Sequence, residues 1–85
     1  MNKPKELTFY TDPDSKPCRL MGHIINSIIE NTNISVTTIN VNNEPKTARE
    51  HLIDKLPTFT TKSRDNALKR LTGCQTYTEL KDFCN

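Results

Sequence analysis

The sequence of 85 residues contains no tryptophan, two glycines and few aromatic side chains, 6% in all. Hydrophobic residues make up 33% of the chain, and no apolar run approaches the roughly 18 residues that a membrane-spanning helix needs. The lysine-rich start, residues 1–6, leads into no signal-like apolar stretch. We therefore expect a cytoplasmic protein that is not processed and does not enter a membrane.

Concentrated charge of one sign is also missing. The 12 Lys and Arg and the 10 Asp and Glu residues give a net charge of +2 and are well mixed along the chain. There is no block of about five like charges and no basic stripe interleaved with aromatic residues. Binding to nucleic acid is therefore not expected.

Cysteine and histidine are sparse. Cys18, Cys74 and Cys84 are an odd number, at spacings that match neither a zinc site nor a secreted disulfide scaffold. His23 and His51 have no partner at i, i+4 spacing, and a five-residue step turns Cys18 and His23 onto different helix faces. We expect reduced thiols and no metal site.

The length of the chain limits it to one small core. At this size about 60 to 65% of the surface is buried, which supports one sheet covered by a few helices and excludes a large multilayer enzyme. No internal repeat or low-complexity tract divides the sequence. Residues 1–85 are therefore predicted to form a single domain and a monomer.

The first part of the chain predicts a strand and a helix. Residues 6–11 are β-branched and aromatic, and the turn cluster 12–14 ends them. A helix follows with Ser15 as its N-cap and Pro17 in its first turn, and it ends near residues 31–33. The apolar stripe expected to form core is Met21, Ile24, Ile25, Ile28 and Ile29.

The middle of the chain predicts a second strand and a short helix. Residues 34–41 are mostly β-branched, but their apolar positions shift phase between Val36 and Ile39. This strand is therefore expected either to be buried on both faces or to carry a bulge. After a turn at 42–44, Pro45 opens a short polar helix that ends at about residue 51 or 52.

The last part predicts a hairpin and a helix. Strands at 58–61 and 67–71 flank a turn at 62–66, and Thr76 with Glu79 has the form of a capping box. The inner face of this last helix is Tyr77, Leu80 and Cys84, with Phe83 beside them. The order β-α-β-α-β-β-α predicts a three-layer α/β/α sandwich around a four-stranded mixed sheet, with a right-handed crossover between the first two strands.

Residue 15 is the place where reactive chemistry is expected. The start of a helix offers unpaired N–H groups and the positive end of its dipole, both of which stabilise an anion. A cysteine there, paired with a second thiol three residues later, would be an activated thiolate. The sequence has Ser15 at that place and a semi-buried Cys18 three residues on.

Three segments resemble motifs of one protein family, the small thioredoxin-fold redox proteins of the glutaredoxin type. Ser15-Lys16-Pro17-Cys18 stands where that family has C-x-x-C. Leu56-Pro57-Thr58 is similar to the family's apolar-Pro-Thr segment, in which the proline is cis and faces the redox pair. Thr72-Gly73-Cys74, just ahead of the last helix, resembles the Gly-Gly-Cys segment that touches glutathione.

The resemblance implies a role for each matching position. Ser15 takes the place of the attacking cysteine, and Cys18 is the resolving cysteine. Lys16 and Pro17 are the dipeptide between them. Pro57 is the cis-proline.

The same resemblance implies the lining of a binding groove. Leu56 supplies backbone groups to an extended peptide or to glutathione, and Gly73 after Thr72 allows close approach to the backbone. Cys74 and Gln75 line the far edge, with Gln75 where glutaredoxins have an Asp. Cys74 is expected to be a packed or surface thiol and not a second redox centre, and Cys84 is expected to be a core residue.

Other positions place the chain between thioredoxins and glutaredoxins. Phe9 and Asp14 stand where thioredoxins have a buried Asp and a Trp, which favours the glutaredoxin side. A proline second in the dipeptide is the thioredoxin pattern.

Ser15 leaves two interpretations open. A serine hydroxyl forms no disulfide, so either Ser15 replaces a natural cysteine, which is our preferred interpretation, or the protein is a natural family member that binds without turnover. In a purely structural alternative, Ser15 is only a helix cap that contributes about 1 kcal/mol to stability, and Cys18 is only a core residue.

The leading functional hypothesis is a thiol-disulfide oxidoreductase that reduces protein disulfides. By resemblance, its client is an enzyme such as ribonucleotide reductase, its reductant is glutathione or a flavoprotein of the thioredoxin-reductase type, and it holds no bound cofactor. The first rival is a non-catalytic module that grips an extended peptide at Leu56-Pro57 and across Gly73. The second is a single-thiol protein in which Cys18 forms a mixed disulfide.

Overall fold

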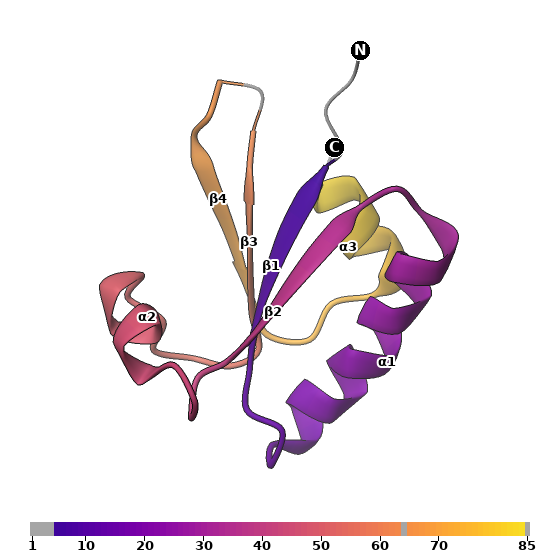
Figure 1. Cartoon of the computed structure of the whole chain (residues 1–85). Helices are drawn as coiled ribbons and strands as arrows, with labels where there is room; N and C mark the ends of the chain where they lie inside the picture. Colours follow the sequence, from indigo (N-terminus) through magenta and orange to yellow (C-terminus); the bar gives the residue numbers. More distant parts are fainter. Residues whose placement is uncertain (1–4, 64, 85) are drawn as a thin grey trace.

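The computed structural model describes residues 5–63 and 65–84. Within them, the chain forms one four-stranded sheet with helices packed on it (Figure 1). The elements are β1 (Glu6–Thr11), α1 (Lys16–Asn31), β2 (Ser35–Asn40), α2 (Pro45–Glu50), β3 (Thr58–Lys62), β4 (Leu68–Thr72) and α3 (Tyr77–Phe83). The predicted order and the α/β class are confirmed.

The sheet is mixed, as expected. Its strand order is β2-β1-β3-β4, with β1 parallel to β2 and antiparallel to β3, and with β3 antiparallel to β4. The predicted hairpin is therefore present, although its predicted turn at 62–66 includes residue 64, which lies outside the described residues. Of the helices described, none is both long enough and apolar enough to cross a membrane.

One row of residues crosses three strands at the same end of the sheet. Tyr10 of β1 pairs with Thr58 of β3, and Thr58 pairs with Thr72 of β4. The segments that follow β1 and β4 and the segment that precedes β3 therefore leave the sheet together.

The core lies between the sheet and the two helices α1 and α3, which cover the same face (Figure 1). At its centre the rings of Phe9 and Phe59 stack with centroids 5.1 Å apart. The buried cluster is Leu7, Phe9, Met21, Ile25, Ile28, Ile34, Phe59, Leu80 and Cys84.

The opposite face is covered more thinly, by α2 and the residues that follow it. The ring of His51, directly after α2, lies 6.1 Å from that of Tyr10 on β1. This thin layer completes the three-layer arrangement.

The stripe predicted for α1 is partly wrong. Met21, Ile25 and Ile28 are buried, but Ile29 is 51% exposed. Ile29 follows Gly22 by seven residues, so both lie on one side of the helix. Gly22 lines a pocket together with Thr38 of β2, so this side faces β2, and the described residues add no strand beyond β2.

The expectation for the second strand is also wrong. β2 pairs with β1 one residue to one from Ser35 to Asn40, without a bulge, and it is not buried on both faces. Val36 and Ile39 are both half-buried and lie on opposite faces of the strand, because their separation in sequence is odd. The shift of phase therefore reflects an edge strand that has one apolar residue on each face.

The last helix follows the prediction closely. The Thr76 side chain accepts a hydrogen bond from the backbone N–H of Glu79, and the Glu79 carboxylate accepts one from the backbone N–H of Thr76. Leu80 and Cys84 are buried, as expected for the inner face. The capping box thus sets where α3 begins.

Candidate active site at the end of the sheet

The site predicted from the sequence is assembled from three segments that leave the sheet at one end. They are the turn from β1 into α1, the segment ahead of β3, and the segment after β4. The row from Tyr10 through Thr58 to Thr72 brings them together.

The turn from β1 into α1 is held by Asp12, which the sequence analysis treated only as part of a turn. One carboxylate oxygen, Oδ1, accepts hydrogen bonds of 3.0 Å from the backbone N–H of Asp14 and from the Asn42 side chain. The carbonyl of Asp12 also accepts from the N–H of Ser15, at 3.0 Å. Asp12 therefore fixes the backbone just before residue 15 and ties it to the loop after β2.

Ser15 is the N-cap of α1, as predicted. Its backbone is extended, with φ −87° and ψ 129°, and its carbonyl accepts the N–H of Arg19 at 3.0 Å. Its half-buried side chain makes no capping hydrogen bond. Helix capping alone therefore does not explain why a residue with a side-chain hydroxyl stands at this position.

The start of α1 is electrostatically suited to an anion. Its first turn carries no acidic side chain, so no carboxylate within that turn offsets the positive end of the helix dipole. Lys16 and Pro17 are exposed there, whereas Cys18 is 1% exposed and so more deeply buried than expected. Residues 15 and 18 are one helical turn apart and thus neighbours on the same helix face.

The Leu56–Pro57 peptide bond is cis, as the resemblance implied. Pro57 is fully buried, and its carbonyl accepts the N–H of Gly73 at 2.8 Å. Leu56 is half-buried directly beside it. The segments ahead of β3 and after β4 are therefore hydrogen-bonded to each other at the site.

The segment after β4 is also tied to α1. The backbone N–H of Gln75 donates to the sulfur of Met21 at 3.1 Å, and the Gln75 side chain donates to the carbonyls of Thr72 and Gly73, each at 3.3 Å. Thr72 and Cys74 are exposed. The contact with Met21, which the sequence does not signal, positions the far edge of the predicted groove.

Gly73 has a φ of +92°, a backbone conformation that residues other than glycine rarely adopt. A Cβ at this position would meet no atom within 4 Å, so strain alone opposes a substitution. We expect Gly73→Ala to lower the free energy of unfolding by about 1 to 2 kcal/mol. Urea denaturation measures this change.

Gly22 is the matched control. It lies within α1, and a Cβ there would also meet nothing within 4 Å. Gly22→Ala is expected to raise stability by about 0.5 to 1 kcal/mol, because alanine favours a helix. Equal effects of both substitutions would show that the backbone at Gly73 carries no special constraint.

The remaining thiols differ in their surroundings. Cys74 is exposed, so of the two expected alternatives it is a surface thiol. Cys84 is buried against the core, as predicted, and burial raises the pKa of its thiol despite the nearby charge of Lys69. Cys84 therefore belongs to the core and not to the site.

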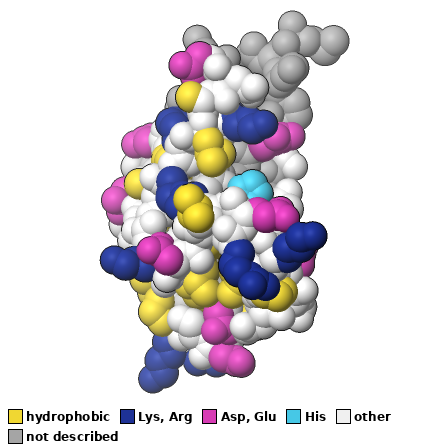
Figure 2. Space-filling view, turned by 90° about the vertical axis from the view of Figure 1, so that its left-hand side faces the viewer, with side chains coloured by type: hydrophobic (Ala, Val, Ile, Leu, Met, Phe, Trp, Pro, Cys, Tyr) yellow, Lys and Arg dark blue, Asp and Glu magenta, His cyan; other side chains and the backbone are white. Residues whose placement is uncertain are grey.

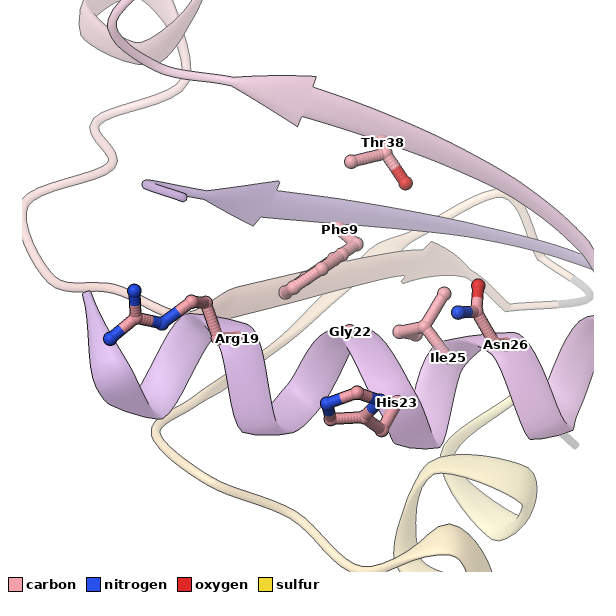
Figure 3. Close-up of a pocket in the computed structure, with 7 residues that line it drawn as sticks. All are labelled: Phe9, Arg19, Gly22, His23, Ile25, Asn26 and Thr38. Atoms are coloured by element: carbon pink, nitrogen blue, oxygen red, sulfur yellow. The ribbon is translucent and has the colours of Figure 1, made fainter. Parts of the chain in front are cut away.

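A separate open pocket lies between α1 and the strands β1 and β2 (Figure 3). Its volume is about 420 Å³, and Arg19, His23 and Asn26 reach it from α1, Phe9 from β1 and Thr38 from β2. None of the predicted site residues lines it. Within residues 5–63 and 65–84, no three Cys, His, Asp or Glu side chains come together as a metal site.

Comparison with known proteins supports the same fold. The thioredoxin family model matches residues 3–85. No curated protein sequence matches the chain.

Solved structures of thioredoxins superimpose well on the chain at low sequence identity. Chloroplastic thioredoxin z has a TM-score of 0.83 at 18% identity, covering 93% of this chain and 74% of the other. A variant thioredoxin of Halobacterium salinarum has a TM-score of 0.81 at 21% identity, covering 91% of this chain and 68% of the other. Mitochondrial thioredoxin 3 of Saccharomyces cerevisiae, in its oxidised form, has a TM-score of 0.75 at 20% identity, covering 95% of this chain and 76% of the other.

Proposed function

Because this chain belongs to the thioredoxin family, we propose that its site serves thiol-disulfide exchange with a protein client. The supporting observation is the convergence of three motifs at one sheet end. The start of α1 carries residues 15 and 18, the cis peptide bond precedes Pro57, and Gly73 donates a hydrogen bond to the Pro57 carbonyl.

The reaction needs a thiolate at position 15. That thiolate attacks one sulfur of the client disulfide, forms a mixed disulfide and releases the other client sulfur as a thiolate. Cys18 then attacks the sulfur at position 15, which closes a disulfide between positions 15 and 18 and frees the reduced client. Both steps conserve electrons within the thiol-disulfide pairs.

The surroundings of position 15 suit the first step. The positive end of α1, with no acidic residue in its first turn, favours the anionic form of a thiol at its N-cap. Lys16 adds positive charge next to it. The buried position of Cys18 suits a resolving thiol that reacts within the protein.

The client segment is proposed to lie extended across Leu56 and Gly73. Pro57 has no backbone N–H, and its carbonyl already accepts the Gly73 N–H, so Leu56 is the neighbouring residue that can offer both a backbone donor and a backbone acceptor. Thr72, Cys74 and Gln75 border the same groove. Ribonucleotide reductase is one client of the expected kind, and glutathione or a flavoprotein reductase is the proposed source of electrons.

The serine at position 15 is compatible with two forms of this proposal. A serine hydroxyl is not ionised at neutral pH, so this chain lacks the attacking thiolate. We propose that Ser15 stands in place of a cysteine. The Ser15 side chain makes no capping hydrogen bond, which also fits the second candidate, a module that binds extended peptides without turnover.

Parallel disulfide-reduction assays test the proposal. Insulin with dithiothreitol and a glutathione mixed disulfide with glutathione are offered to this chain and to Ser15→Cys. Turnover by Ser15→Cys alone supports the oxidoreductase, and the preferred substrate assigns it to the thioredoxin or the glutaredoxin side. Failure of both proteins leaves the peptide-binding module.

A further inference from the structure

Leu52 is the residue whose backbone least fits its side chain. Among the described residues, those with positive φ are Leu52 at 55°, Asn66 at 68° and Gly73 at 92°. Glycine and asparagine tolerate this conformation, whereas a leucine is strained in it. The leucine side chain is also 77% exposed, so contacts within the protein do not explain the choice.

The strain arises from the way α2 ends. The N–H of Leu52 donates to the carbonyl of Arg49 at 3.1 Å, and the N–H of Ile53 donates to that of Ala48 at 2.9 Å. These two bonds form a Schellman motif, in which the residue at the place of Leu52 is left-handed and usually glycine. A glycine would close α2 with less strain and would expose no apolar side chain.

A second contact holds this turn in place. The Arg70 guanidinium of β4 donates to the carbonyl of Leu52 at 3.0 Å and also to the carbonyl of His51. The ring of His51 packs near that of Tyr10. The backbone that presents Leu52 is therefore anchored to two strands of the sheet.

This anchored turn leads along the chain into the proposed groove. Arg70 lies two residues before Thr72 and so on the same face of β4, two rows from the one from which the site segments leave. The chain from Leu52 continues directly to Leu56 and Pro57. Figure 2 shows the side of the molecule that carries α2 and β4, where hydrophobic side chains gather at the height of α2 and are scattered among charged ones above.

We propose that Leu52 is a specificity-determining contact for the client protein, which places an apolar side chain next to its disulfide against this leucine. The inference rests on the proposed function, because the client is the molecule whose extended segment reaches Leu56. A small disulfide without such a side chain gains nothing from Leu52. The free energy gained by burying one leucine side chain is large enough to change KM about tenfold.

Kinetics in a Ser15→Cys background test this inference. Leu52→Gly and Leu52→Ala are each expected to raise KM for insulin about tenfold, with kcat unchanged. KM for hydroxyethyl disulfide, a small substrate, is expected to stay the same. Leu68→Ala is the matched control, because Leu68 is a 54% exposed leucine at the other end of β4, and it should alter neither KM.

Thermal unfolding separates recognition from a structural role. Leu52→Gly should raise Tm by about 3 to 6 °C as the strain is removed, whereas Leu52→Ala should leave Tm nearly unchanged. An unchanged KM for insulin in both Leu52 variants overturns the inference while the proposed function stands. A Ser15→Cys protein that is inactive on both substrates overturns the proposed function and this inference with it.

Discussion

Ser15→Cys is expected to reduce insulin disulfides at least about 100-fold faster than the chain with Ser15. The reason is the nucleophile, because a serine hydroxyl neither ionises at pH 7 nor forms a disulfide. A thiol at the start of α1 meets unpaired backbone N–H groups and the positive end of the helix dipole. Turbidity of insulin in the presence of dithiothreitol measures the gain.

Removal of Cys18 in the same background is the control. Ser15→Cys combined with Cys18→Ala should still attack the client but should stop at the mixed disulfide, since no resolving thiol remains. Mass spectrometry of the trapped complex identifies this species. A Ser15→Cys protein no faster than the dithiothreitol blank contradicts the proposed role of position 15.

Phe59→Ala is expected to lower the free energy of unfolding by about 3 to 5 kcal/mol. Phe59 is 0% exposed, stacks on Phe9 at 5.1 Å and is the second residue of β3. A chain of 85 residues has a total stability of about 4 to 13 kcal/mol. The substitution therefore removes between about a quarter and all of this stability, which urea or thermal denaturation measures.

Leu68→Ala is the control for this prediction. Leu68 lies on the neighbouring strand β4 but is 54% exposed, so its loss should change stability by no more than about 0.5 kcal/mol. A Phe59→Ala protein as stable as Leu68→Ala would place the centre of the core elsewhere.

Local patterns were sufficient to predict the elements of the fold. The Thr76–Glu79 capping box, the turn cluster after Thr11 and the proline at the start of α2 each mark a boundary that the structure confirms. They are reliable because each depends on residues adjacent in sequence. The order of elements then leaves few ways to build a sheet.

The errors concern what lies beside an element in space. Ile29 was predicted to be core because it continues the apolar period of α1, but it is 51% exposed on the side of the helix that faces the edge strand β2. The shift of phase between Val36 and Ile39 was interpreted as a sign of a buried or bulged strand, again from the spacing of apolar residues alone. Periodicity shows which residues share a face and not whether another element covers that face.

The candidate site was predictable only in part. The cis bond before Pro57 followed from the resemblance and not from local sequence, since few X-Pro bonds are cis. The hydrogen bond from Gly73 to Pro57 and the contact of Gln75 with Met21 join residues far apart in the chain. The left-handed backbone of Leu52 had no signal at all, because leucine is an unusual choice there.

Titration of a thiol at position 15 tests the central claim most directly. Ser15→Cys in a Cys18→Ala background is followed by its thiolate absorbance from pH 3 to 10, with the Cys18→Ala protein as the blank. We predict a pKa between about 3.5 and 7.5, because the start of α1 stabilises the anion. A pKa at or above the ordinary cysteine value of about 8.5 would contradict the assignment of position 15 as the site of the attacking thiolate.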